Sequence, residues 1–121
     1  MHGTSVASAA VGAVCGLAKE ANVIALKIWD KPNLARSAHV YDAFEWIVNE
    51  IPKTGRPSIV NMSVSFGPDA VLDRQIRAAI KAGIHFVGAA GNTHQDAGLR
   101  FPGGSECSYL ERVNFQGLTL H

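Results

Sequence analysis

Residues Ser58 to Asn92 read SIVNMSVSFGPDAVLDRQIRAAIKAGIHFVGAAGN, and the fold prediction rests mainly on this stretch. It opens with the short apolar run Ser58 to Met62 and closes with a second, Ile84 to Ala89, and both predict strands. Between them Asp69 can open a helix that Gly83 ends. The apolar residues of that helix recur at helical spacing: Leu72, Ile76, Ala79 and Ile80. Two strands joined by one helix predict a parallel pair with a crossover connection.

The same alternation extends toward the N-terminus. Thr4 to Cys15 consists almost entirely of small residues and predicts a buried helix, and Asn22 to Trp29 predicts a strand covered on both faces. A helix capped by Ser37 follows and ends at Pro52. Its apolar residues are Val40, Phe44, Ile47, Val48 and Ile51. We therefore expect an α/β fold, a partial doubly wound parallel sheet with helices on both faces.

The C-terminal part of the chain has a different character. Thr93 to His121 combines glycine, proline and mixed charge without a sustained hydrophobic period. We expect residues 1–92 to form the folded segment, with its core ending near Asn92, and residues 93–121 to form an irregular, divergent tail.

Composition narrows the classes of partner. The chain has 121 residues, 47% of them hydrophobic and 17% charged, which is enough apolar material for one packed domain. The formal net charge is +1 and the basic residues are scattered, so neither nucleic acid nor a membrane surface is an expected partner. No apolar run approaches the roughly 20 residues that span a bilayer. The histidines and cysteines lack metal-ligand spacing, so we expect no metal and no cofactor.

In an open parallel sheet, ligand-binding and catalytic residues lie in the loops at the carboxyl ends of the strands. Asn61 to Gly67 follows one predicted strand and Ala89 to Asn92 the next, while His2 stands where the first helix begins. Each has an ordinary structural explanation when taken alone. A terminal histidine is usually solvated, an asparagine after glycine is usually a turn residue, and serines in loops satisfy backbone groups.

Taken together and in order, these motifs resemble the subtilase family of serine proteases. The resemblance covers His2 to about Asn92 and rests on the HGTxxA helix start, the strand end Asn-Met-Ser, the strand end Ala-Ala-Gly-Asn and the connecting VIALKIWD. It implies a subtilisin-like three-layer fold and a serine-type endopeptidase that hydrolyses peptide bonds in polypeptide substrates. It also implies secretion, if the chain is part of a full-length family member.

The resemblance assigns roles residue by residue. His2 would take the proton from a serine nucleophile and return it to the leaving amine, since imidazole titrates near neutrality. Asn92 would donate its side-chain amide to the oxyanion of the tetrahedral intermediate. One wall of the cleft would bind the peptide as an added strand. That wall comprises Ser63, Val64, Ser65, Phe66 and Gly67, and residues 33–37 would form the opposing rim.

Two differences from the family pattern bear on activity. The family has an aspartate before its histidine and a nucleophile in a later Gly-Thr-Ser-Met-Ala segment, whereas only Met1 precedes His2 and no such segment occurs up to His121. Ser105 is the serine whose surroundings most resemble that nucleophile segment, but no sequence typical of an apolar helix follows it. We therefore expect an internal segment of a family member that is inactive alone.

The alternative is a non-catalytic relative that binds extended peptides or a protease partner. A nucleotide-binding α/β domain is less favoured, because the chain has neither GxGxxG nor GxxxxGK.

The wall itself also departs from the family. Ser65 and Phe66 stand where subtilases have glycines, which let a substrate backbone lie close. We expect side chains at these positions to narrow or reshape the cleft.

Overall fold

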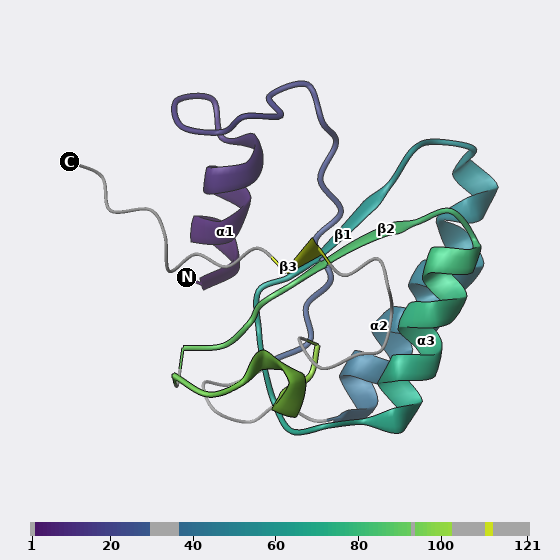
Figure 1. Cartoon of the computed structure of the whole chain (residues 1–121). Coiled ribbons are helices and arrows are strands. Elements are labelled where there is room, and N and C mark those ends of the chain that lie inside the picture. The colour runs from purple at the N-terminus through teal and green to yellow at the C-terminus, as the bar shows by residue number, and fades with distance from the viewer. Residues whose placement is uncertain (1, 30–36, 93, 103–110, 113–121) are drawn as a thin grey trace.

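The computed structural model describes residues 2–29, 37–92, 94–102 and 111–112. Its helices are α1 (His2–Val11), α2 (Ser37–Glu50) and α3 (Ala70–Lys81), with short 3-10 turns at Pro52–Thr54 and Ala97–Leu99. Its strands are β1 (Ile59–Met62), β2 (His85–Gly88) and β3 (Glu111–Arg112). Helices α2 and α3 lie together on one side of the strands and α1 lies on the other (Figure 1).

The sheet is parallel throughout, in the order β1-β2-β3. Ile59 is opposite His85 at one end of the first pair and Met62 is opposite Gly88 at the other. The predicted strand, helix, strand order of residues 58–92 is therefore confirmed, and the partial α/β fold with it. Because β1 and β2 run the same way, the loops that follow them leave the sheet at the same edge.

The core lies where α2 and α3 pack against the strands. The apolar faces predicted for both helices are confirmed, because α2 and α3 each bury three of their predicted residues. The ring of Phe44 on α2 stacks on that of Phe86 on β2, with centroids 5.8 Å apart. The buried apolar residues are Val40, Phe44, Ile47, Met62, Leu72, Ile76, Ala79, Ile84, Phe86 and Phe101.

The prediction of a buried first helix is wrong. Helix α1 ends at Val11 rather than Cys15, and none of its residues is buried. Within the described chain it packs against no other helix or strand. Its alanine, serine and glycine side chains offer little apolar area, so close packing against a neighbour would gain little hydrophobic stabilisation.

The strand predicted at Asn22–Trp29 is also wrong. Residues 22–28 form no ladder, and Trp29 makes only an isolated bridge. Val23 and Ile24 are more than half exposed, while Ile28 packs against the core. A strand apolar on both faces needs a ladder partner and a cover on each side. Within the described chain this segment has neither over most of its length.

The core does not end near Asn92, as the sequence suggested. Phe101 and Pro102 are fully buried, and Glu111–Arg112 pairs with β2 as β3, so the tail is not wholly irregular. A single buried aromatic residue produces no hydrophobic period, which is why the pattern missed it. Most of residues 103–121 lies outside the described chain, so the divergence of the tail stays a prediction.

Asp69 joins the two helices. Its Oδ1 accepts hydrogen bonds from the backbone amides of Val71 (2.9 Å) and Leu72 (3.1 Å), as an N-cap of α3 should. Its Oδ2 accepts from the Tyr41 hydroxyl of α2 at 2.8 Å. Partial burial alone would raise the pKa of Asp69, but the bonds from Leu72, Tyr41 and Val71 outweigh it and lower that pKa below its usual value.

Replacing Asp69 by alanine is expected to lower the free energy of unfolding at neutral pH by about 1 kcal/mol. Because the folded state lowers the pKa of Asp69, its contribution is present above the unfolded value of about 3.9 and is lost as pH falls through the folded value. Urea unfolding of D69A and the parent chain at several pH values measures this. Tyr41→Phe keeps the cap and should cost less. A difference that stays constant into the acid range would contradict the assignment.

Candidate functional site

His2, the first residue of α1, contacts the loop that follows β1. Its Nε2 lies 2.9 Å from the main-chain oxygen of Ser63, a residue 61 positions away. A carbonyl oxygen only accepts, so Nε2 carries the proton and donates. Since α1 packs against no other described helix or strand, this hydrogen bond is a specific link between the helix start and the end of β1.

The loop after β1 begins beside the loop after β2. The amide of Ala89 donates to the main-chain oxygen of Met62 at 3.1 Å, one step beyond the last ladder pair. Asn61 Nδ2 donates to Ser63 Oγ at 2.8 Å, which ties these two side chains of the β1 end together. The sequence rule about strand carboxyl ends therefore correctly predicts that the two loops are neighbours.

Gly91 brings the second loop against the first. Its φ of +89° lies in the region that glycine adopts without strain. A Cβ at Gly91 would lie 3.5 Å from Ser65 Oγ, so the Ser65 side chain is directly opposite this glycine. Asn92 follows and is exposed at the end of the loop. In the described chain no hydrogen bond joins Asn92 to His2, so the structure relates them through the two loops rather than by direct contact.

Phe66 does not have the role predicted for its main chain. Its N–H donates to the Phe101 oxygen at 3.0 Å, and its oxygen accepts from the Phe101 N–H at 2.9 Å. The two rings stack with centroids 5.0 Å apart. Both main-chain groups of Phe66 are therefore already paired, and an added peptide strand would have to pair with residues before it. Val64 is half-buried against the core and Gly67 is exposed.

Phe101 is the residue of this site that sequence reasoning missed. The available signal was an aromatic residue directly before proline, a position that favours extended backbone. The opposing rim, predicted for residues 33–37, lies outside the described residues apart from the start of α2 at Ser37. Ser105 lies outside them as well.

The tautomer of His2 limits what the ring does in this arrangement. When the imidazole is neutral and Nε2 donates to Ser63, the free lone pair is on Nδ1. To accept a proton at Nε2, the ring must release Ser63 and move its proton to Nδ1. In this arrangement the imidazole therefore lies against the loop that follows β1, with Nε2 engaged by the Ser63 oxygen.

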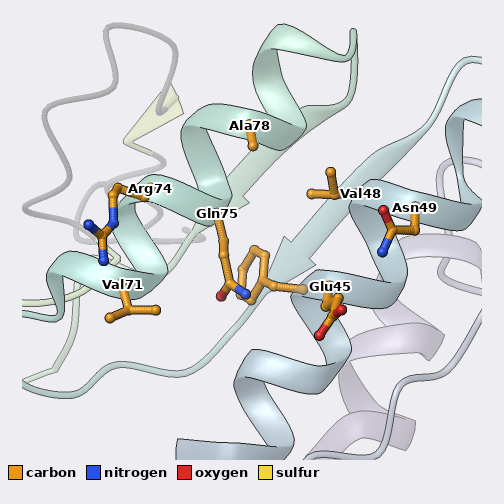
Figure 2. Close-up of a pocket in the computed structure, with 8 residues that line it drawn as sticks. Glu45, Val48, Asn49, Val71, Arg74, Gln75 and Ala78 are labelled. Atoms are coloured by element: carbon orange, nitrogen blue, oxygen red, sulfur yellow. The ribbon is translucent and has the colours of Figure 1, made fainter.

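A separate hollow lies between α2 and α3, away from these loops. It is an open surface depression of about 390 Å³, and Figure 2 shows side chains of both helices around it. Gln75 Nε2 donates to the Tyr41 main-chain oxygen at 3.3 Å, whereas Gln75 Oε1 is buried without a partner. Its lining includes Phe44, Glu45, Asn49, Val71 and Arg74. It contains no residue of the predicted site.

Among the described residues, no group of three histidine, cysteine, aspartate or glutamate side chains is placed to hold a metal ion. None of the described helices has the length and apolar character needed to cross a membrane.

Comparison with known proteins gives a consistent set of matches. Residues 1–114 match the model of the subtilase family. The chain is 37% identical over 107 residues to Subtilisin-like protease 11 of Arthroderma benhamiae, which covers 87% of this chain and 27% of that protein. It is 35% identical over 106 residues to Subtilisin-like proteinase Mp1 of Magnaporthiopsis poae, covering 84% of this chain and 26% of that protein.

Comparison of the fold with solved structures also finds a subtilisin-like protein. A crystal structure of a cold adapted subtilisin-like serine proteinase superimposes with a TM-score of 0.76 and 31% sequence identity. The match covers 84% of this chain and 36% of that one. The chain thus spans about a quarter of the length of the curated relatives it matches.

Proposed function

Because this chain belongs to the subtilase family, we propose that it is part of a serine endopeptidase in which His2 is the general base and Asn92 stabilises the oxyanion. The observation that carries the proposal is the contact of His2 Nε2 with Ser63, which places the imidazole at the wall predicted to bind the peptide. The substrates proposed for the whole protein are polypeptides. Its secretion is part of the proposal and rests on the family resemblance.

The steps proposed for this chain use three groups. The peptide lies along the main chain of Ser63 to Ser65, in the extended form that edge pairing requires. His2, once its ring leaves the Ser63 oxygen, accepts the proton of the attacking hydroxyl at Nε2 and later returns it to the leaving amine. The exposed Asn92 amide donates to the oxygen that gains charge, where removal of one donor in subtilisin itself costs about 100- to 1000-fold in rate.

The 121 residues alone are proposed to bind peptides without cleaving them. His2 is the only triad residue that matches the family pattern in this sequence, and a histidine without its nucleophile leaves little catalysis. Binding without cleavage is also what the alternative, a non-catalytic peptide-binding relative, requires. The proposal for the chain is therefore tested first by binding.

Titration of the labelled 121-residue chain with acetyl-Ala-Ala-Ala-Ala, which has a free carboxylate, is expected to shift the NMR signals of Ser63, Ser65, the His2 ring and the Asn92 side-chain amide. The carboxylate imitates the oxyanion and accepts from Asn92. A fluorogenic tetrapeptide amide should be hydrolysed no faster than in buffer. Asn92→Leu should weaken binding of the carboxylate peptide more than binding of its carboxamide form, because a charged oxygen accepts the stronger hydrogen bond.

Asn49→Leu is the matched control, because Asn49 is an exposed asparagine on α2, away from the loops. It should change neither affinity. Absence of shifts at saturating peptide would contradict the proposed cleft. Hydrolysis by the purified chain that a serine-directed inhibitor abolishes would contradict the proposed dependence on further segments.

A further inference from the structure

Asn61 points to the side of the sheet on which α1 lies. In β1, Met62 is part of the core beside α2 and α3, and Val60 packs against it. Because successive side chains of a strand point to opposite faces, Asn61 points away from that core, toward the side of α1 (Figure 1). Its side chain is exposed. Packing therefore does not explain an asparagine here, and strands generally disfavour this residue.

The Asn61 side chain binds the same residue that contacts the imidazole. Its Nδ2 donates to Ser63 Oγ at 2.8 Å. The main-chain oxygen of Ser63 lies 2.9 Å from His2 Nε2. Side chains two positions apart in an extended chain share one face, so Asn61 and Ser63 meet without distortion of the strand end. Ser63 thus connects Asn61 to His2, through its hydroxyl on one side and its carbonyl on the other.

The carbonyl of Ser63 is restrained before and after it. The Ala89 amide donates to the Met62 oxygen at 3.1 Å, which holds the preceding peptide group. Val64, the next residue, packs against the core. The bond from Asn61 adds a restraint on Ser63 itself, between these two attachments. An acceptor held in place selects one tautomer of a neutral imidazole, because only the nitrogen that carries the proton can donate to it.

We propose that Asn61 is a positioning residue, which acts through Ser63 to hold the His2 imidazole with its proton on Nε2. The meaning of this inference for catalysis rests on the proposed function, in which His2 is the general base. In the arrangement that Asn61 stabilises, Nε2 already carries a proton and cannot accept another. Asn61 therefore keeps the base beside the loop after β1 and sets the tautomer from which it must change before it reacts.

NMR of the ring nitrogens in the 121-residue chain, at a pH that keeps imidazole neutral, reports which nitrogen carries the proton. In the parent, the two nitrogen shifts of His2 should differ more than those of His85, an exposed histidine on β2. Asn61→Ala should reduce the His2 difference to about that of His85, because the tautomers then exchange. Asn61→Asp should restore most of it, since a carboxylate accepts from the Ser63 hydroxyl.

A second variant tests the route through Ser63. Ser63→Ala removes the hydroxyl and keeps the main-chain oxygen, so it should reduce the His2 difference as much as Asn61→Ala does. The double variant should show no further loss, because both single changes remove the same hydrogen bond. Asn49→Ala is the matched control, since Asn49 is an exposed asparagine on α2, and it should leave the His2 shifts unchanged.

Unchanged His2 shifts in Asn61→Ala and Ser63→Ala would overturn the role of Asn61. They would leave the proposed function standing if acetyl-Ala-Ala-Ala-Ala still binds the parent chain. If Asn61→Ala changes the His2 shifts as expected but no peptide binds, the positioning of His2 is supported and the proposed peptide site fails.

Discussion

Replacing Phe101 by alanine is expected to lower the free energy of unfolding by about 3 to 5 kcal/mol, the cost of truncating a buried phenylalanine. Phe101 is 1% exposed and stacks on Phe66 with centroids 5.0 Å apart. Its main chain also pairs with Phe66 in both directions, so a cavity there would weaken the attachment of the loop that follows β1. Phe101 lay outside the core expected from the sequence, and this prediction makes it one of the largest contributors to stability.

Chemical denaturation followed by fluorescence and by far-ultraviolet circular dichroism measures the loss. Leu99→Ala is the matched control, because Leu99 lies two residues earlier and is 66% exposed. We expect its effect to stay within about 0.5 kcal/mol. Equal effects of F101A and L99A would show that residues 94–102 do not belong to the core.

The parts of the fold that the sequence predicted are those with a repeating pattern. Leu72, Ile76 and Ala79 share one face of α3 at helical spacing, and that face is buried. The Asp69 cap follows from local hydrogen bonding and also appears as expected. Such features depend on neighbours in sequence, so they are visible before the tertiary structure is known.

The predictions that were wrong are those that depend on which other segments pack against a given segment. Asn22–Trp29 has the composition of a strand, but within the described chain it finds no ladder partner along most of its length. Helix α1 forms, yet none of its residues is buried. Local propensity determines whether a segment tends to be extended or helical, whereas burial depends on distant cover that a single sequence does not display.

The candidate site likewise contains features that the sequence predicted and features that it could not predict. The rule of strand carboxyl ends correctly predicted that the loops after β1 and β2 would meet. The contact between His2 and Ser63, 61 residues apart, is consistent with the family resemblance and could not be derived from spacing. The pairing of Phe66 with Phe101 was invisible, because no motif links them, and it removes the Phe66 main chain from the predicted peptide-binding edge.

Phe86→Ala is the second substitution expected to cost about 3 to 5 kcal/mol. Phe86 is 2% exposed on β2, and its ring stacks on Phe44 of α2 at 5.8 Å, so it joins the sheet to the helical layer. Ile59→Ala on the adjoining strand is the matched control. Ile59 is 70% exposed, and its truncation should cost well under 1 kcal/mol. A loss in I59A as large as in F86A would contradict the burial of this side of the sheet.

The two phenylalanine variants together test whether the loop that follows β1 and the sheet share one core. Phe86 belongs to β2 and stacks on Phe44 of α2, whereas Phe101 pairs with Phe66 at the end of the loop that follows β1. If these regions unfold as one cooperative unit, each variant should shift a single transition that fluorescence and circular dichroism report at the same denaturant concentration. Two separate transitions in F101A would instead mean that residues 94–102 detach from an intact sheet.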